Sequence, residues 1–297
     1  MASRPSGRQA ERVREETRRG AQDSQPDEPG GARVTRDRAS GVRSLPAPLT
    51  ARIEAWLEST LARMAPLAFR DLRKGVQSLS TLYVEARGAG SLARRARESP
   101  ARRGAFATYF ATLHLLTIHH ALRELSPEPA VKRVVDLGCG TGAAGAGAAL
   151  AFDPPPRLLL LDRSGWALAE ARHTLRALGL EGATRRSRLP AMPRLGPGDL
   201  VVLGWVLNEC EAATRQAVAR QLETAARRGA RVLVAEPLAG FVAPWWQAFA
   251  GALAPAGLRA QLWKAPVSLP AWIARMDRAA GLAHHELGAR LLTGPVR

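Results

Sequence analysis

A glycine-rich turn between a strand and a helix is the feature that most restricts the fold of this chain. Arg133–Leu137 (RVVDL) is short and apolar, as expected for a buried strand, and Gly138–Gly142 (GCGTG) follows it directly. The alanine-rich segment 141–152 then has the composition of a helix. Glycines at such a junction let the backbone turn sharply and approach a ligand closely. The segment therefore predicts a nucleotide-type site at the end of a buried strand.

Alternating strands and helices continue towards the C-terminus. Strands are predicted at 157–162, 199–206, 231–237 and 258–265, and helices at 164–180 and 213–228. Short apolar strands that alternate with helices of this length form a parallel sheet covered on both faces. We therefore predict an α/β fold with a doubly wound, mostly parallel sheet over residues 129–297.

The N-terminal part has two predicted regions of different character. Residues 1–46 are rich in Arg, Glu, Pro and Gly with few large apolar residues, which predicts a disordered tail. Ile53, Trp56 and Leu57 then recur at helical spacing, and helical patterns continue over 69–85 and from Phe106 onwards. Residues 47–128 are therefore predicted to be a helical region that packs on, or caps, the domain after it.

Two aspartates bear on the ligand. Asp136 lies two residues before the first glycine, where dinucleotide enzymes normally have an apolar residue because their helix start receives a pyrophosphate. S-adenosylmethionine (SAM) carries a cationic amine and sulfonium, which a carboxylate favours. Asp162 ends the next strand, where a carboxylate can accept hydrogen bonds from a ribose diol. SAM is the preferred ligand; a nicotinamide or flavin cofactor, or no ligand at all, are the alternatives.

The pattern over 133–236 resembles the class I SAM-dependent methyltransferases, chiefly in VVDLGCGTG and LLLLDRS. The resemblance implies a Rossmann-like fold and S-adenosylmethionine as cofactor. It implies methionine and ribose contacts from the glycine loop, ribose contacts from Asp162, and adenine contacts near Arg163 and Leu189. The implied cofactor-binding residues are Asp136, Gly138, Cys139, Gly140, Thr141, Gly142, Asp162, Arg163, Leu189 and Gly204.

A closer resemblance involves the segments after the fourth and fifth strands. Leu207–Glu209 (LNE) and Glu236–Pro237, together with RGAFATYFATL at 103–113, resemble the small-ribosomal-subunit methyltransferase-like family of bacteria and mitochondria. That resemblance implies a role in assembly of the small ribosomal subunit. Two departures are clear: Leu238–Gly240 stands in place of Gly-Thr-Pro, and the clustered cysteines of an iron–sulfur site are missing. We therefore expect no metal site.

Catalytic candidates are few. The loop after the fourth strand, Gly204–Glu209 (GWVLNE), lacks the prolines that usually accompany methylation of an exocyclic amine. Carbon-5 methylation of a pyrimidine needs a cysteine nucleophile, but the context of Cys210 favours a small buried thiol. Asn208 and Glu209 are the remaining candidates, as positioning groups or a general base. The alternative for Glu209 is a helix start, where the dipole favours a carboxylate.

The charge balance points to a polyanionic partner. Lys and Arg number 43 against 26 Asp and Glu, a net charge of +17 that is spread along the chain. This favours rRNA or the small ribosomal subunit, although arginine-rich codon usage is an alternative explanation. The chain has neither an apolar run of membrane-spanning length nor a secretory signal, and it has only two cysteines, so we expect a cytoplasmic protein.

These observations predict a SAM-dependent methyltransferase that acts on rRNA or on a small-subunit assembly particle. A SAM-binding assembly factor without catalysis is one alternative, because a substrate motif is missing. A small-molecule methyltransferase whose N-terminal helices form a lid is the other. The sequence makes no prediction of the oligomeric state.

Overall fold

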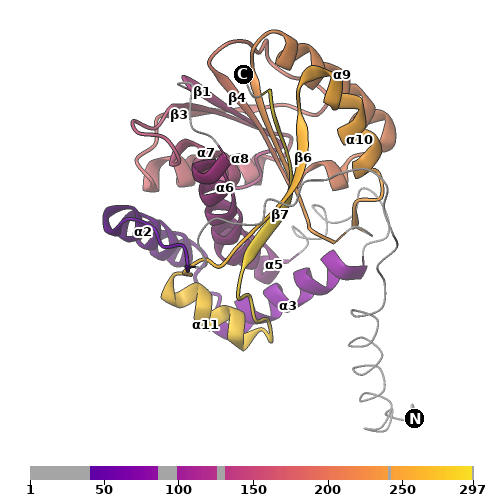
Figure 1. The fold of residues 1–297 in the computed structure, drawn as a ribbon. Coiled ribbons are helices and arrows are strands. Elements are labelled where there is room, and N and C mark those ends of the chain that lie inside the picture. Colours follow the sequence, from indigo (N-terminus) through magenta and orange to yellow (C-terminus); the bar gives the residue numbers. More distant parts are fainter. Residues whose placement is uncertain (1–40, 86–98, 126–130, 240–241, 296–297) are drawn as a thin grey trace, which may run out of the picture. The chain divides into compact units, whose positions relative to one another are not determined.

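A mostly parallel sheet lies at the centre of the described chain (Figure 1). The computed structural model describes residues 41–85, 99–125, 131–239 and 242–295, and within them the sheet has seven strands in the order β3-β2-β1-β4-β5-β7-β6. The strands are β1 (Arg133–Leu137), β2 (Arg157–Asp162), β3 (Gly182–Arg186), β4 (Asp199–Gly204), β5 (Arg231–Glu236), β6 (Arg259–Ala265) and β7 (Leu287–Gly294).

Strands β1 to β5 pair in parallel, and β7 runs antiparallel to both β5 and β6. The predicted doubly wound, mostly parallel sheet is therefore confirmed. The strand order reverses between β1 and β4, where Asp136 pairs with Val202. In open α/β sheets the carboxyl ends of the strands at such a switch point form the usual ligand crevice. The topology thus predicts a ligand site at the glycine loop after β1.

Helices cover both faces of the sheet. They are α2 (Ala47–Arg63), α3 (Phe69–Glu85), α5 (Pro100–Ala105), α6 (Ala111–Leu125), α7 (Ala143–Ala149), α8 (Gly165–Ala177), α9 (Ala212–Arg227), α10 (Trp246–Leu253) and α11 (Ala271–Ala279). A π-helical turn, η1 (Phe106–Phe110), joins α5 to α6, and short 3-10 turns follow at η2 (Leu207–Glu209) and η4 (Ala254–Ala256).

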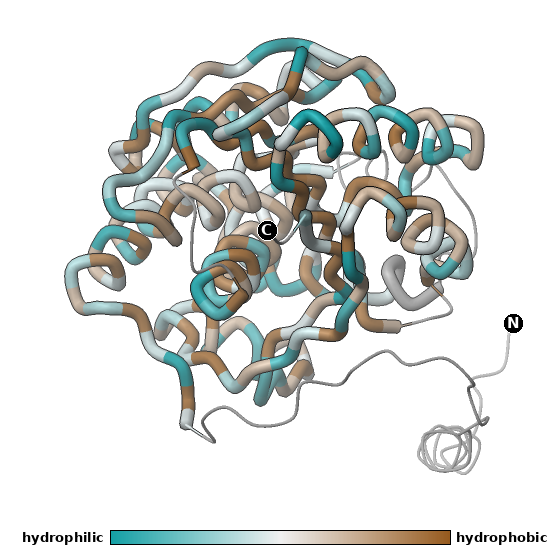
Figure 2. Tube along the Cα trace, turned by 45° about the horizontal axis from the view of Figure 1, so that its top comes forward, coloured by the Kyte–Doolittle hydropathy of each residue, from teal (hydrophilic) through white to brown (hydrophobic). Residues whose placement is uncertain are grey.

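Alternate residues of the strands divide the core into two layers. Val134 belongs to the buried cluster that contains α6, α7 and α8, whereas Val135 belongs to the cluster that contains α9 and α10. This division follows from the period of two in a strand, which sends successive side chains to opposite faces. Both faces of the central strands β1, β4 and β5 are buried, so these strands are nearly continuous apolar runs. Along the outer helices, hydrophobic and hydrophilic residues alternate (Figure 2).

The N-terminal helices share the core of the first layer. Ile53 and Trp56 of α2 and Val76 of α3 are buried in the same cluster as Val134 of β1. Most of the predicted tail, residues 1–40, lies outside the described residues. Its last residues do not match the predicted disorder, because Arg43 N donates to Pro266 O at 2.8 Å and Arg43 O accepts from Ser268 N at 2.8 Å.

Local patterns missed several elements. Strand β3 lies at the sheet edge with four of its five residues exposed, so it has no hydrophobic alternation to reveal it. Strand β7 and helices α10 and α11 were also not predicted, and α7 is shorter than the predicted helix at 141–152. None of the helices in the described ranges combines the length and apolarity needed to cross a bilayer.

Candidate active site

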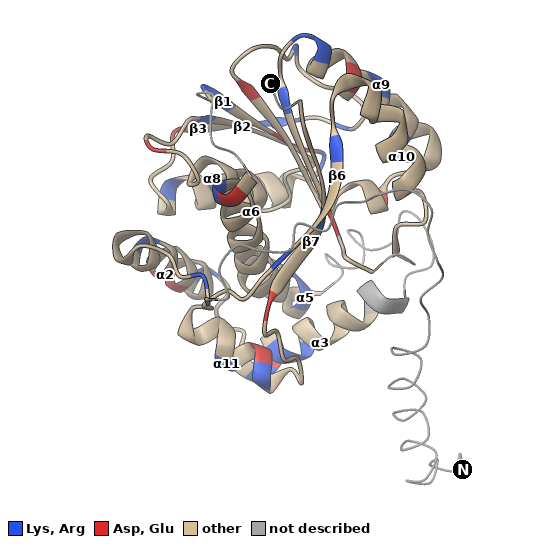
Figure 3. Cartoon of the chain, in the orientation of Figure 1, with Lys and Arg blue, Asp and Glu red and all other residues tan. Residues whose placement is uncertain are grey.

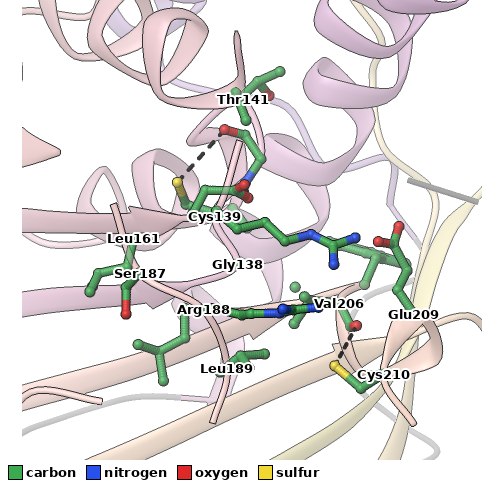
Figure 4. Close-up of a pocket in the computed structure, with 18 of the residues that line it drawn as sticks. Gly138, Cys139, Thr141, Leu161, Ser187, Arg188, Leu189, Val206, Glu209 and Cys210 are labelled. Carbon is green, nitrogen blue, oxygen red and sulfur yellow. Dashed lines mark hydrogen bonds between the residues drawn. The ribbon is translucent and has the colours of Figure 1, made fainter. Parts of the chain in front are cut away.

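A cavity of about 360 Å³ lies at the carboxyl ends of β1, β2 and β4. Its volume falls in the range of about 300–1,000 Å³ that is usual for small-molecule sites. The predicted cofactor residues in its lining are Gly138, Cys139, Gly140, Thr141, Asp162, Arg163, Leu189 and Gly204. Figure 4 shows the loop after β1 on one side and the segment after β4 on the other.

The glycine loop is fixed to the neighbouring strand. The amides of Gly138 and Cys139 both donate to Leu161 O, at 2.8 and 2.9 Å. Gly138 has φ of 75°, and a Cβ added there would lie 2.4 Å from Cγ2 of Val206. Both the backbone conformation and the close approach therefore require glycine. Glycine at this position thus lets the loop after β1 pack directly against the segment after β4, beside the cavity.

Asp162 is held at the same loop. Its Oδ2 accepts from Gly140 N at 3.0 Å and its Oδ1 accepts from Ser164 N at 2.7 Å. An ionised carboxylate offers about four acceptor positions, so two remain for a ligand. This half-buried side chain lines the cavity, and its remaining acceptor capacity suits a ribose diol.

Asp136 does not lie where the sequence analysis expected it. Its carboxyl is fully buried outside the cavity lining, and its Oδ2 accepts from Gly145 N of α7 at 2.8 Å. Its Oδ1 has no hydrogen-bond partner among the described residues. Burial raises the pKa of this carboxyl to about 7. Asp136 lies on the same strand face as Val134, and α7 packs on that face. Its side chain therefore supports α7. The predicted direct contact between Asp136 and a cationic ligand is wrong, because the carboxyl lies outside the cavity lining.

Two glycines explain this arrangement. A Cβ on Gly145 would lie 2.8 Å from Oδ2 of Asp136, so only glycine lets α7 approach the carboxyl. Gly142, also predicted to contact the cofactor, lies outside the cavity lining with φ of 78° at the start of α7. It packs against β2 and α8, because a Cβ there would meet Leu160 at 2.9 Å.

The loop after β4 is held by a buried acid. Glu236, at the end of β5, is fully buried and its Oε1 accepts from Leu207 N at 2.8 Å. Burial raises the pKa of Glu236 to about 8, against the lowering effect of the Leu207 and Asn208 amides. Trp205, the first residue of this loop, has φ of 55° and donates its backbone N–H to Ala235 O at 2.8 Å.

The two catalytic candidates are placed differently. Glu209 lines the cavity, whereas Asn208 does not, and its Oδ1 accepts from Trp245 Nε1 at 3.1 Å. Cys210 also lines the cavity (Figure 4), and burial raises its pKa to about 11. The thiol is therefore protonated at neutral pH and is a poor nucleophile. The residue is half-buried at the cavity, so it is not the fully buried side chain that the sequence analysis favours.

Sequence reasoning missed an aromatic group in the lining. Phe106 of η1, His114 of α6, Trp166 of α8 and Trp205 all face the cavity. The His114 and Trp205 rings are stacked, with centroids 3.8 Å apart and planes 8° apart. The aromatic spacing in 106–116 predicted a helix, but only the packing of that helix on the sheet brings its residues to the glycine loop.

Within the described ranges, no cluster of three or more His, Cys, Asp or Glu side chains is arranged to hold a metal ion. The expected absence of a metal site stays a prediction.

A family model described as an O-methyltransferase domain matches residues 69–244, more than half of the chain. The chain belongs to this family. It is accordingly a SAM-dependent methyltransferase domain with S-adenosylmethionine as its cofactor, as the sequence analysis predicted. The matched range includes α3, the π-helical turn and α6, as well as the sheet as far as β5.

Curated relatives match a shorter part. The chain is similar to "Ribosomal RNA large subunit methyltransferase G" of Streptomyces coelicolor, at 39% identity over 110 residues, which are 36% of this chain and 28% of that protein. The protein of the same name from Streptomyces griseus is 36% identical over 119 residues, 38% of this chain and 31% of the relative. The chain spans less than a third of the length of these relatives. Their names specify the large subunit, whereas the resemblance noted above was to a small-subunit family.

Two solved structures cover more of the chain. The O-methyltransferase NcsB1 from neocarzinostatin biosynthesis, in complex with SAM, matches 75% of this chain and 68% of its own, with 18% identity and a TM-score of 0.49. The mitomycin 7-O-methyltransferase MmcR matches 82% and 74%, with 21% identity and a TM-score of 0.45.

Proposed function

We propose that this protein transfers the methyl group of SAM to ribosomal RNA, in a ribosomal subunit or an assembly particle. The observation that carries the proposal is an acid-free basic segment at the cavity. Residues 182–198, which comprise β3 and the loop after it, contain four arginines and no Asp or Glu. Arg188 lines the cavity, and Arg185 and Arg186 are exposed on the edge strand beside it.

This basic edge suits a nucleic-acid backbone, because phosphate contacts from Arg and Lys dominate RNA and DNA affinity. Figure 3 shows Lys and Arg distributed over many elements, so the β3 edge adds to a field that already attracts polyanions. The names of the two Streptomyces relatives support rRNA as the substrate class. A cytoplasmic location is part of the proposal, because rRNA is the substrate.

The proposed cofactor contacts follow the cavity lining. Asp162 holds the ribose hydroxyls with the acceptor positions that Gly140 and Ser164 leave free. The backbone of Gly138–Thr141 surrounds the methionine part, and Arg163 and Leu189 lie beside the adenine, with Gly204 closing the site after β4. Asp136 and Gly142 act indirectly, by fixing α7 beneath the loop.

SAM supplies an electrophilic methyl group, and the chain's own residues have mainly a positioning task. Glu209 and Glu211 are acidic side chains of the β4 loop that line the cavity. Glu209 is the predicted candidate, which can orient the acceptor or take its proton. Asn208 is a positioning residue that acts through its hydrogen bond with Trp245. The protonated Cys210 thiol takes no part as a nucleophile.

Transfer of a tritiated methyl group from SAM tests the proposal. Purified small subunits, large subunits and protein-free rRNA are each incubated with the wild-type protein and with Asp162→Ala as the matched control. We expect the wild-type protein to label rRNA and the Asp162→Ala variant to label it less. Label in the small subunit would support the small-subunit resemblance, and label in the large subunit would support the similarity to the large-subunit methyltransferases. SAM binding without label in any substrate would contradict the proposal and leave an assembly factor without catalysis.

A small-molecule O-methyltransferase is the second candidate. Phe106 and His114, from the helices before the sheet, line the cavity and give the acceptor side an enclosed aromatic character. The O-methyltransferase family match agrees with this reading. Label that enters a hydroxylated aromatic compound, while rRNA stays unlabelled, would favour this candidate over the first.

A further inference from the structure

One wall of the cavity takes no part in the proposed cofactor contacts. It consists of Phe106, His114 and Trp205, and we call it the aromatic wall. We propose that the aromatic wall is the acceptor subsite and that it binds a planar, uncharged aromatic ring, either an unpaired nucleobase or a free hydroxylated ring. This inference rests on the proposed methyl transfer and names the chemical class of its substrate.

The ring geometry supplies a flat apolar surface. His114 and Trp205 are parallel to within 8° at a centroid distance of 3.8 Å, and Phe106 meets His114 edge-on at 6.4 Å and 81°. Aromatic rings pack on one another in stacked and edge-to-face arrangements, so the ring of a bound acceptor, as a fourth ring, continues the same pattern. Every nucleobase has a π-face, which is why stacking on such a wall tolerates different bases.

The backbone conformation of Trp205 is strained. A bulky residue other than glycine with φ of 55° is strained by about 1–3 kcal/mol. The strain persists because two hydrogen bonds hold the loop: Trp205 N to Ala235 O at 2.8 Å, and Leu207 N to Glu236 Oε1 at 2.8 Å. Strain of this kind concentrates at functional sites, and here it presents an indole to the cavity.

The aromatic wall is also fixed next to the glycine loop. Val206 packs so tightly on Gly138 that a Cβ on that glycine would lie 2.4 Å from Val206 Cγ2. On the other side, a Cβ on Gly140 would lie 3.5 Å from Cε1 of Phe106. Figure 4 shows Val206 and Gly138 close together in the cavity. A ring held by the wall therefore lies beside the loop that we assign to the methyl donor.

The π-helical turn before the sheet places Phe106 at the cavity. Phe106 begins the π-helical turn η1, in which Tyr109 is fully buried and donates its hydroxyl hydrogen to Asp277 of α11. π-Helical turns are rare, and they are found frequently at functional sites. The turn leaves Phe106 at the cavity while Tyr109 anchors the same segment to α11.

The aromatic wall carries no charge at neutral pH. Burial lowers the pKa of His114 to about 3, so its imidazole is neutral when stacked on Trp205. A phosphate or carboxylate gains no ion pair from these three rings. The wall therefore selects the ring of an acceptor, and Arg188 in the cavity lining attracts its phosphates.

Binding to the protein saturated with S-adenosylhomocysteine tests the subsite, because that ligand occupies the proposed cofactor contacts. Calorimetry compares two matched pairs of probes: naphthol with its saturated analogue decalol, and a single-stranded RNA heptamer with the same heptamer lacking its central base. We expect a preference of about tenfold or more for the aromatic member in at least one pair. The pair that shows it distinguishes a free ring from a nucleobase.

Variants assign the preference to the wall. Trp205→Leu should remove it, Trp205→Phe should retain most of it, and Trp272→Phe, which lies outside the cavity lining and packs on Phe69, should leave it unchanged. S-adenosylhomocysteine affinity and melting temperature are measured for each variant. If Trp205→Leu loses S-adenosylhomocysteine binding, His114→Ala takes its place.

Absence of an aromatic preference in both pairs, or a preference that survives loss of the Trp205 ring, would overturn the subsite. The outcome is separate from the methyl-transfer assay. A ring preference without any methyl transfer would support the subsite and contradict the proposed function. Methyl transfer to rRNA without a ring preference would support the proposed function and contradict the subsite.

Discussion

Replacing Glu236 by glutamine should stabilise the protein at alkaline pH. The Glu236 side chain is fully buried at the end of β5, where its Oε1 accepts from Leu207 N at 2.8 Å. Its Oε2 has no hydrogen-bond partner in the described part of the chain. Glutamine keeps the carbonyl oxygen for Leu207 N and cannot ionise, so it reproduces the protonated acid in shape and charge.

The magnitude follows from the pKa of Glu236, which burial raises from 4.5 to about 8. The folded state keeps a proton that the unfolded chain releases above pH 4.5, so the free energy of unfolding falls as pH rises between these values. Each pKa unit is worth about 1.4 kcal/mol, which makes the full loss about 5 kcal/mol. Burial also raises the pKa of Asp136, from 3.8 to about 7, and this lowers the free energy of unfolding with rising pH in the same way. Asp136 is present in both the wild type and the variant, so it does not affect the difference between them.

Urea unfolding across about pH 5 to 9 measures this difference. We expect the glutamine variant to match the wild type at the acid end and to exceed its stability progressively towards the alkaline end. Glu223→Gln is the matched control, since Glu223 pairs with Arg227 at the surface of α9 and should shift stability by only about 0.5 kcal/mol. Parallel stability curves for wild type and Glu236→Gln would refute the reasoning, because Glu236 would then ionise alike in both states.

Four further substitutions have directions set by the structure. Asp162→Ala should weaken SAM binding about 10- to 100-fold in calorimetry, because two charge-assisted hydrogen bonds are lost. Gly138→Ala should lower the free energy of unfolding by about 1–3 kcal/mol and impair SAM binding, since its Cβ meets a neighbouring side chain at 2.4 Å; a melting curve like that of the wild type would contradict this. Tyr109→Phe removes a donor from the buried Asp277 and should cost about 1–3 kcal/mol in chemical denaturation. Cys210→Ser should preserve methyl transfer, because the thiol is protonated at neutral pH; an inactive serine variant would restore a nucleophilic role.

Some features of this protein follow from neighbouring residues alone. The apolar runs of β1 and β2, the glycine loop and the helical spacing of α9 are local patterns, so the alternation of strands and helices was predictable with close bounds. The positions of the glycine loop and Asp162 were predictable too, because a motif that joins a strand to a helix determines its own geometry. The α/β class and an adenosine-type ligand at the glycine loop were therefore accessible from the sequence. The choice of SAM over a dinucleotide rested on a direct contact from Asp136, which instead lies outside the cavity lining and accepts from Gly145 N.

Other features depend on contacts between distant segments. The side chain of Asp136 turns towards α7 because of the strand face on which it lies and because Gly145 leaves room for it. Strand β3 pairs at an exposed edge without a hydrophobic pattern, and β7 enters the sheet antiparallel between β5 and β6. Sequence periodicity reports burial along one segment and is silent on which segment is the neighbour.

The aromatic wall of the cavity shows the same division. His114 and Trp205 are 91 residues apart in the sequence, yet their rings stack at 3.8 Å because α6 packs over the sheet beside the loop after β4. Glu236 holds that loop from a third segment. The chain's local patterns thus placed the glycine loop and Asp162 at the end of a buried strand, whereas the packing of helices on the sheet decided which side chains form the aromatic wall, since only long-range contacts bring those segments together.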